Sequence, residues 1–218
     1  MNRREILTGG VLLSLGSLTA MADEKPAKKA RRPRPARETV WKYVPLDPKI
    51  AADRGYGYYP PNGCMYASFK AGMDTYADAI EADNPSLAAV CRQFPFLALR
   101  SGKTGCGSME SLCGTINGAS MFMGLFINDL AELHQMIQQL AEYVKETELP
   151  VYVPAGDKHP NFVTAISHSV TCAENKGAWL AKDPSEAHKQ LRQERCMRVT
   201  ASVIAKAVEM LNEKFKNA

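Results

Sequence analysis

The segment NDLAELHQMIQQLAEYV, residues 128–144, decides the fold class. Its large apolar residues recur every three or four positions, at Leu130, Leu133, Ile137, Leu140 and Val144. An α-helix has about 3.6 residues per turn, so this spacing places them on one helix face. Asn128 or Asp129 provides a suitable N-cap for that helix. The segment therefore predicts an amphipathic helix that packs its apolar face against a core.

The same helical period extends through the rest of the chain after residue 62. Helices are predicted over Gly63–Ala82, from Asn84 to the residue before Pro95, over Ser108–Ile127, from Asn128 or Asp129 onward, over Asn161–Lys182, and from Asp183 through Met210. Leu149–Asn161 contains three prolines and is predicted to be a loop, in which Val151–Val153 is the one short β candidate. The predicted fold is all-α, a single bundle of five to six helices.

The composition predicts a packed domain, and the segment that precedes its helices in the sequence predicts an extended arm. The chain has 218 residues, of which 45% are hydrophobic and 23% charged, and these proportions exclude a wholly disordered protein. Thr39–Asn62 is rich in proline and aromatic residues, which predicts an extended arm laid over the core with one short helix near Pro48–Arg54. We therefore interpret residues 39–218 as one domain.

Residues 1–22 have the features of an export signal. Arg3 and Arg4 precede a short apolar run from Val11 to Leu18, and small residues occupy the expected cleavage site at Ala20 to Ala22. The run is too short to span a bilayer. Paired arginines and weak hydrophobicity favour the twin-arginine type over an ordinary secretory signal, which remains the alternative. This predicts a periplasmic protein, exported after folding.

The basic residues of the chain are concentrated near its beginning. Asp23–Glu38 carries seven Lys or Arg residues against three acidic residues and contains Pro26, Pro33 and Pro35. Such a segment without large apolar residues is predicted to be a disordered basic linker. Because an exported protein rarely meets nucleic acid, we exclude nucleic acid as a partner; a solvated spacer, or a tether to anionic lipid or to an acidic redox partner, remains.

Ser111–Asn128 has no charged residue, and Gly114 and Gly118 form a G-x-x-x-G pair within it. A membrane-spanning helix is one interpretation of this pattern. Polar residues interrupt the segment, so a buried central helix is favoured. Its glycines would then allow another helix, or a cofactor, to approach the backbone closely.

Cysteines are the most informative residues for function. The six are Cys64, Cys91, Cys106, Cys113, Cys172 and Cys196. No C-x-x-C or C-x-x-C-H is present, so the usual attachment rule predicts no covalent haem, and zinc-finger spacing is also absent. Residue types alone leave two possibilities open: disulfides, which suit an oxidising compartment, and a metal site built from thiolates of different helices.

The cysteine pattern resembles that of the C_GCAxxG_C_C family of redox-active proteins, to which the split-Soret cytochromes are related. Cys64 corresponds to the first isolated cysteine, and Cys113 to Gly118 corresponds to the glycine-containing element, with Thr115 in place of alanine. Cys172 and Cys196 correspond to the last two cysteines. The resemblance extends over roughly Leu46–Asn212.

The resemblance implies an iron–sulfur cluster held by four cysteines and no haem, because the haem-attachment motif of the split-Soret relatives is missing. The implied ligands are Cys64, Cys113, Cys172 and Cys196. Thiolates are the soft donors that such clusters use. Cys91 and Cys106 lie outside this set, and each is an additional ligand or the two form a disulfide.

A few other side chains are candidates for a supporting role. Gly114 and Gly118 would let backbone N–H groups reach the cluster sulfurs. His168 lies four residues before Cys172, which on a predicted helix places both on one face. It is then a ligand or a supporting donor, and the alternative is a satisfied or exposed histidine. Glu194, Arg195 and Arg198 flank Cys196 and either offset the cluster's charge or form a solvated helix face. His134, His159 and His188 are predicted to lie at the surface.

Together these observations predict an exported electron carrier rather than an enzyme. Its partner would be a periplasmic or membrane-bound oxidoreductase, and a homo-oligomer remains open. No motif for catalysis by side chains alone is present. The alternative is a disulfide-stapled helical module that binds or scaffolds without redox turnover.

Overall fold

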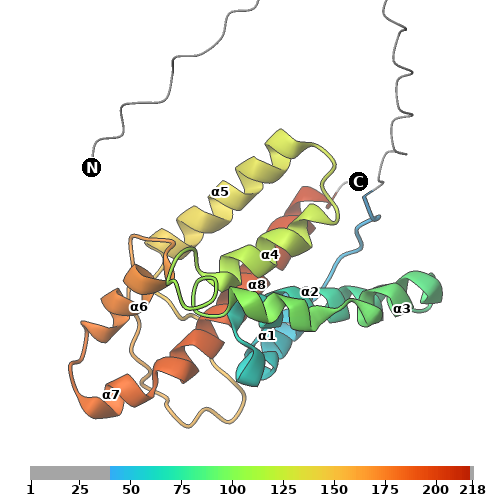
Figure 1. Cartoon of the computed structure of the whole chain (residues 1–218). Coiled ribbons are helices and arrows are strands. Elements are labelled where there is room, and N and C mark those ends of the chain that lie inside the picture. Colours follow the sequence, from blue (N-terminus) through green and yellow to red (C-terminus); the bar gives the residue numbers. More distant parts are fainter. Residues whose placement is uncertain (1–39, 217–218) are drawn as a thin grey trace, which may run out of the picture. The chain divides into compact units, whose positions relative to one another are not determined.

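The structure, a computed structural model, describes residues 40–216. In this range the chain is helical and contains no strand (Figure 1), so the predicted all-α class is confirmed. The elements are α1 (Pro48–Asn62), α2 (Cys64–Ile80), α3 (Pro85–Gln93), the 3-10 helix η1 (Phe96–Gly102), α4 (Gly114–Gly124), α5 (Leu130–Glu146), α6 (Cys172–Leu180), α7 (Glu186–Gln190) and α8 (Arg192–Lys214). The predicted export signal and linker, residues 1–38, lie outside the described residues.

Two helices organise the core. α8 packs against α1, α2, α4 and α5, and α2 packs against α1, α3, α4 and η1. Phe69 of α2, Phe122 of α4, Leu140 of α5 and Ile204 of α8 are all buried in one hydrophobic cluster. Burial of such side chains stabilises the fold by roughly 1.5–3 kcal/mol each. Of the apolar face predicted for residues 128–144, α5 buries Leu140 and Val144, whereas Leu130 at its start is exposed.

α1 is longer than the short helix predicted near Pro48–Arg54. Asp47 caps its N-terminus, with the carboxylate accepting from the backbone N–H of Lys49 at 2.7 Å. A Cβ added at Gly55 would lie 2.9 Å from Ile204 of α8, so the glycine that weakens the local helix propensity also permits close packing. Tertiary packing against α8 thus extends the helix to a kink at Pro60, which has non-helical ψ of 137°.

The helix predicted over Ser108–Ile127 begins later, because α4 starts only at Gly114. Before it, Thr104, Cys106 and Ser108 have φ values of 55°, 62° and 68°. A right-handed helix requires negative φ, so the chain cannot be helical here. The result is a tight loop between η1 and α4.

The helix predicted over Asn161–Lys182 is wrong over its first half, because α6 begins only at Cys172. Leu149 and Ala165 exchange two backbone hydrogen bonds of 3.1 and 2.9 Å, and His168 has a φ of 50°. Pairing between segments here satisfies backbone groups that a helix would otherwise satisfy. The β candidate Val151–Val153 forms no strand.

The predicted last helix is divided in two. The hydroxyl of Ser185 accepts from the backbone N–H of His188 at 3.2 Å and caps α7. At Leu191 the backbone leaves helical geometry, with φ −80° and ψ 3°, and α8 follows. The break places the His188 ring on Trp179, with ring centroids 3.7 Å apart. His188 is buried, so its predicted surface position is wrong.

The G-x-x-x-G pair of the uncharged segment serves helix packing. A Cβ added at Gly118 would lie 2.5 Å from the backbone oxygen of Met65 in α2. Only glycine allows α4 and α2 to approach this closely. Ile116 and Phe122 of α4 are buried, as predicted for a central helix. None of the described helices is long and apolar enough to cross a membrane.

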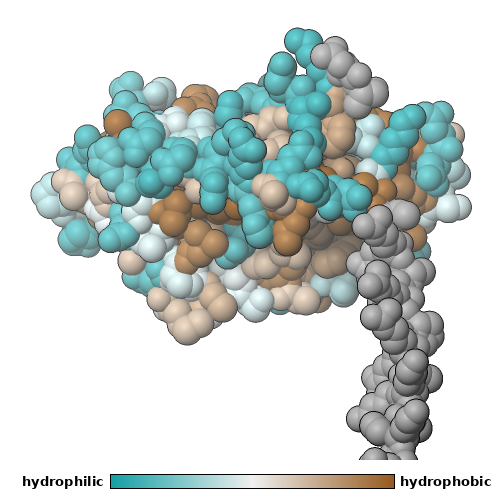
Figure 2. All heavy atoms as spheres, turned by 90° about the horizontal axis from the view of Figure 1, so that it is seen from above, coloured by the Kyte–Doolittle hydropathy of each residue, from teal (hydrophilic) through white to brown (hydrophobic). Residues whose placement is uncertain are grey.

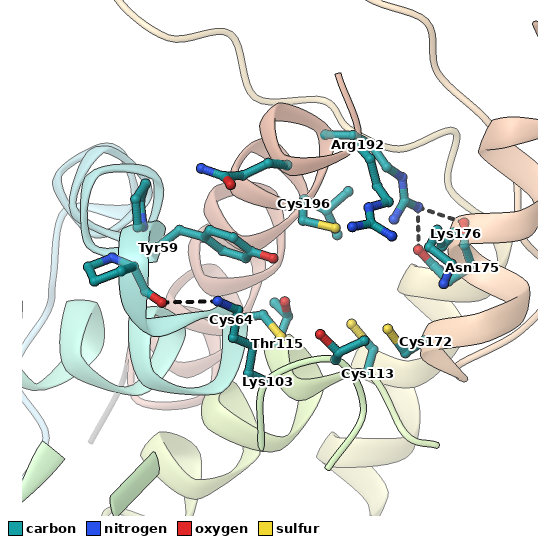
Figure 3. Close-up of a pocket in the computed structure, with 16 residues that line it drawn as sticks. Tyr59, Cys64, Lys103, Cys113, Thr115, Cys172, Asn175, Lys176, Arg192 and Cys196 are labelled. Carbon is teal, nitrogen blue, oxygen red and sulfur yellow. Dashed lines mark hydrogen bonds between the residues drawn. The ribbon is translucent and has the colours of Figure 1, made fainter. Parts of the chain in front are cut away.

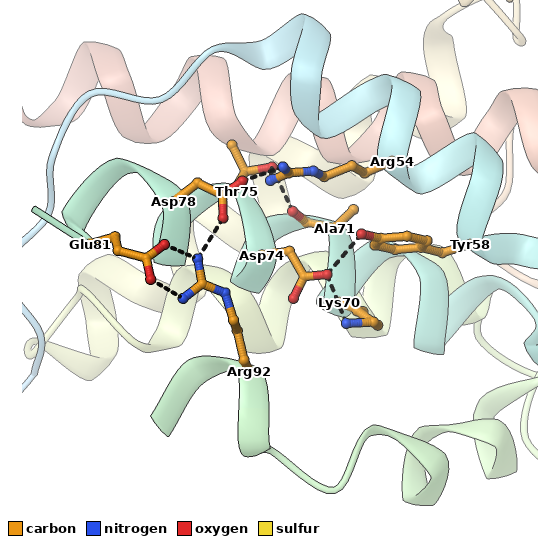
Figure 4. Close-up of polar contacts among 9 residues, drawn as sticks. All are labelled: Arg54, Tyr58, Lys70, Ala71, Asp74, Thr75, Asp78, Glu81 and Arg92. Atoms are coloured by element: carbon orange, nitrogen blue, oxygen red, sulfur yellow. Dashed lines mark hydrogen bonds and ion pairs between the residues drawn. The ribbon is translucent and has the colours of Figure 1, made fainter. Parts of the chain in front are cut away.

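Charged side chains connect the first three helices (Figure 4). Asp78 of α2 pairs with Arg54 of α1 and, at 2.8 Å, with Arg92 of α3. Arg92 also donates to Glu81 at 2.9 Å. These pairs hold α1 and α3 to α2 at the solvent boundary.

Figure 2 shows another face of the molecule from above, where hydrophilic side chains cover most of the surface and hydrophobic ones show between them.

Candidate functional site

Four of the six cysteines line one pocket with a volume of about 210 Å³. They come from four different helices: Cys64 is the first residue of α2, Cys113 precedes α4, Cys172 is the first residue of α6, and Cys196 lies in α8. Figure 3 shows their sulfur atoms around the same space. The fold thus brings together the four residues that the sequence analysis selected, while their role as ligands stays a prediction.

Three of these cysteines lie at helix N-termini. Backbone N–H groups at a helix N-terminus have no partner within the helix and carry partial positive charge, which favours a thiolate over a thiol. The sequence pattern predicts longer helices with Cys113 and Cys172 in their interiors, so this feature could not be seen from it. The physical reason is the late start of α4 and α6 described above.

Gly114 is required by the geometry of the pocket. A Cβ added there would lie 2.5 Å from the backbone oxygen of Gly102 and 2.6 Å from Cys64 Sγ. No side chain fits at that position without moving the backbone or the thiol. Gly118 packs against α2 and does not line the pocket. Of the two predicted supporting glycines, only Gly114 therefore adjoins the cysteines.

The thiols of Cys64 and Cys113 lie side by side in the pocket and influence each other's ionisation. The neighbouring Cys64 thiol, together with Thr115 and the charge of Arg195, outweighs burial and lowers the pKa of Cys113 to about 6. The same pairing and burial raise the pKa of Cys64 above its usual value, and burial raises the pKa of Cys172 to about 11. Cys113 is therefore a thiolate near neutral pH, whereas Cys64 and Cys172 would release protons on binding a cation.

Tyr59 extends from α1 into the pocket (Figure 3). Burial, followed by the charge of the nearby thiols of Cys196 and Cys64, raises the pKa of Tyr59. The phenol consequently keeps its proton and can act as a hydrogen-bond donor inside the pocket. Its position depends on α1 being a full helix, so the sequence showed it only as one aromatic residue of an extended arm.

All charged residues that line the pocket are basic. They are Lys103, Lys176, Arg192 and Arg195. Lys176 forms an ion pair with Glu110. Arg195 is buried and donates to the backbone oxygen of Asn175 at 2.8 Å, but its Nε has no hydrogen-bond partner in the described part of the chain. Of the residues flanking Cys196, Arg195 thus faces the pocket rather than solvent.

The pocket fits a bound group larger than a single ion. Among the described residues, no three His, Cys, Asp or Glu side chains are close enough together to hold one metal ion. Four soft sulfur donors nevertheless surround one cavity, Gly114 leaves its wall free of a side chain, and the Nε of Arg195 lacks an acceptor. Thiolates in this number suit iron among the biological metals.

The remaining predicted site residues lie elsewhere. All six cysteines are free, with Cys91 buried in the core and Cys106 exposed on the loop before α4. The disulfide considered between Cys91 and Cys106 is therefore absent, and neither residue lines the pocket. The alternative of a disulfide-stapled module has no disulfide among the described residues to support it. His168 is exposed beside Glu146, 3.5 Å from its carboxylate. It shares no helix face with Cys172, so the predicted pairing of the two is wrong.

Comparison with known proteins places these residues in context. A family model described as "Putative redox-active protein (C_GCAxxG_C_C)" matches residues 66–210, a range that starts just after Cys64 and includes the other three pocket cysteines. The split-Soret cytochrome c of Desulfovibrio desulfuricans (strain ATCC 27774 / DSM 6949 / MB) is 30% identical over 215 residues, which are 96% of this chain and 75% of that protein.

A solved structure gives the same relationship in three dimensions. It is described as "A novel iron centre in the split-Soret cytochrome c from Desulfovibrio desulfuricans ATCC 27774". Its TM-score is 0.70 at 29% sequence identity, and the match covers 82% of this chain and 73% of that chain. The shared fold therefore extends over most of both proteins.

This relative corrects the cofactor prediction. We expected an iron–sulfur cluster and no covalent haem. The relative is named cytochrome c, which denotes a haem protein, and its solved structure is described by a novel iron centre. The prediction of an iron–sulfur cluster without haem is therefore wrong. It relied on the absence of C-x-x-C-H, the usual motif for covalent haem attachment. The absence of this short motif does not exclude a relationship to haem proteins over the rest of the chain.

Proposed function

Because this chain belongs to the C_GCAxxG_C_C family of redox-active proteins, we propose that it transfers electrons through an iron centre held by Cys64, Cys113, Cys172 and Cys196. The observation that carries this proposal is the convergence of four thiols from four helices on one pocket. The description of a novel iron centre in the related structure favours iron over other thiophilic metals.

The residues around the thiols have definable parts in this function. Iron bound by thiolates changes oxidation state by one electron, which is the chemistry that the centre supplies. The chain holds the sulfurs on four helices, and the protonated phenol of Tyr59 is available as a hydrogen-bond donor beside Cys196. Arg195 offsets negative charge on Cys113. Hydrogen bonds and charges next to ligating sulfurs are known to tune the potential of such centres.

The proposal is tested by metal analysis of single cysteine variants. Full-length protein purified without oxygen should contain iron and show visible absorption that bleaches reversibly on reduction. Cys113→Ser should lose most of this iron. Cys106→Ser is the matched control, because Cys106 is exposed and lies outside the pocket. A haem assay on the same samples separates haem iron from thiolate-bound iron. Equal iron in both variants would remove Cys113 from the site.

We also propose that the protein is exported and meets its partner outside the cytoplasm. Support comes from the sequence alone: Arg3 and Arg4 precede a weakly apolar run, and residues 23–38 form a basic, proline-containing segment. The partner would be a periplasmic or membrane-bound oxidoreductase. Replacing Arg3 and Arg4 by lysine should keep the unprocessed precursor in the cytoplasm, which cell fractionation detects.

A further inference from the structure

Three of the four basic side chains in the pocket have no carboxylate partner in the described part of the chain. The lining contains no Asp or Glu, and of its basic residues only Lys176 pairs with a carboxylate in the described residues. Thiolates account for part of this positive charge, and iron would offset part of the thiolate charge when it binds. Lys103, Arg192 and Arg195 therefore supply positive charge to the pocket without a carboxylate opposite them.

Arg195 is the basic residue of the pocket that most clearly lacks a partner. It is only 3% exposed, and its Nε is a buried donor without an acceptor. The other end of the guanidinium is used, because it donates to the backbone oxygen of Asn175 at 2.8 Å and to the side-chain oxygen of the same residue. A buried charged donor is costly to leave unpaired. The arginine is thus fixed at one end and lacks a partner at the other.

The pocket is accessible to a solute from one side. Lys103 and Arg192 at its edge are exposed, as are Pro60 and Pro61, whereas Cys64, Thr115 and Arg195 at its floor are buried. Lys103 is held at the edge by its bond to the backbone oxygen of Pro61, 3.1 Å away. An anion entering past Lys103 and Arg192 would reach the buried Nε of Arg195.

We propose that the pocket binds a small inorganic oxyanion, with one oxygen accepting from Nε of Arg195 and with Arg192 and Lys103 supplying further positive charge. This goes beyond the proposed electron transfer, because it makes the pocket a site for a small anionic ligand as well as for iron. The anion site consists of residues other than the four cysteines. It can therefore be tested separately from iron binding.

The probe is inorganic phosphate, titrated calorimetrically into the full-length protein at low ionic strength, with the iron content of each sample measured. Wild type should show saturable binding. Arg195→Lys keeps the charge but removes the Nε donor, and should weaken binding about tenfold or more. Arg192→Gln, at the exposed edge, should weaken it several-fold. Arg100→Gln is the matched control, because Arg100 is exposed and outside the pocket.

The outcomes separate this inference from the proposed function. Absence of saturable phosphate binding, or an equal loss in Arg192→Gln and Arg100→Gln, overturns the anion site. If Arg195→Lys fails to fold by circular dichroism, the comparison of Arg192→Gln with Arg100→Gln decides alone. Phosphate binding by a protein without iron would overturn the electron-transfer proposal and leave the anion site standing, and iron without phosphate binding would do the reverse.

Discussion

At the scale of single residues, Tyr59 is the side chain whose effect on the proposed centre can be isolated most cleanly. Its protonated phenol lies in the pocket with Cys196 and can donate to that sulfur. A hydrogen bond to a ligating sulfur stabilises the more negative, reduced state and raises the reduction potential. Tyr59→Phe should therefore lower the midpoint potential, as measured by a spectroscopic redox titration, without reducing iron content.

A neighbouring residue provides the control for that substitution. Tyr58 is adjacent in α1 but donates to Asp74, at 2.8 Å, outside the pocket. Tyr58→Phe removes the same hydroxyl and should leave the potential unchanged. If both variants shift the potential equally, the effect comes from α1 as a whole, and the hydrogen bond to Cys196 would have no specific role.

Gly114 gives a stability prediction at the same scale. An added Cβ would meet the Gly102 oxygen and Cys64 Sγ at 2.5 and 2.6 Å, so Gly114→Ala should destabilise the protein by about 1–3 kcal/mol. Gly177 in α6 has no atom within 4 Å of an added Cβ, so Gly177→Ala should instead stabilise by roughly 0.5–1 kcal/mol. Urea unfolding of both variants measures the two free energies. Equal effects would show that α4 can move away from α2.

At the scale of helices, the ion pairs of Asp78 join α1, α2 and α3 (Figure 4). Burial acts to raise the pKa of Asp78, but Arg54 and Arg92 outweigh it and lower the pKa below 3.8. A carboxyl with a lowered pKa stabilises the fold above its unfolded pKa, and this contribution is lost as the pH falls below about 3.8. Because the side chain is half exposed, the contribution is a few tenths to about 1 kcal/mol.

The test compares Asp78→Asn with wild type across pH. The variant should be less stable at pH 7, and the difference should shrink progressively as the pH falls below about 3.8, measured by thermal unfolding. Asp83→Asn is the control, since Asp83 forms no ion pair with another described residue. A difference between Asp78→Asn and wild type that is the same at all pH values would mean that the ion pairs contribute nothing.

Helices were predictable from sequence where local signals agreed with packing. α3 and α5 have side-chain caps at Asn84 and Asp129 and an apolar face, and both begin where the sequence predicts. The segment before Cys172 was not predictable, because its backbone pairs with distant residues such as Leu149. The periodicity of apolar residues contains information only about residues close in sequence, so it cannot reveal pairing with such distant segments.

At the scale of the whole molecule, the cysteine set was predictable only as a list. Sequence spacing gives no distances between residues as far apart as Cys64 and Cys196, and the family resemblance supplied the choice of four. What the sequence could not supply is the surroundings. The positions of Tyr59 and Arg195 depend on how α1 and α8 cross the pocket, which only the assembled fold determines.

The same assembly predicts how metal removal should propagate through the fold. A ligand that binds only the folded state stabilises it. Here that ligand would join α2, α4, α6 and α8. α2, α4 and α8 also pack on one another, whereas α6 has fewer contacts with the other helices. Its Trp179 donates to the Val163 oxygen at 2.7 Å and stacks on Phe162. Its Asn175 accepts from Arg195 of α8 at 2.8 Å. α6 therefore depends most on the bond that Cys172 would make to iron.

Removing iron with a chelator should accordingly lower the thermal midpoint and loosen α6 before the other helices. Hydrogen–deuterium exchange should accelerate in Cys172–Leu180 by about tenfold or more, because local opening needs less free energy than global unfolding. α3, residues Pro85–Gln93, contributes nothing to the pocket and should keep its exchange rate. Equal acceleration in α3 and α6 would mean that iron stabilises the fold globally. A bond from Cys172 to iron would then have no particular role in holding α6 in place.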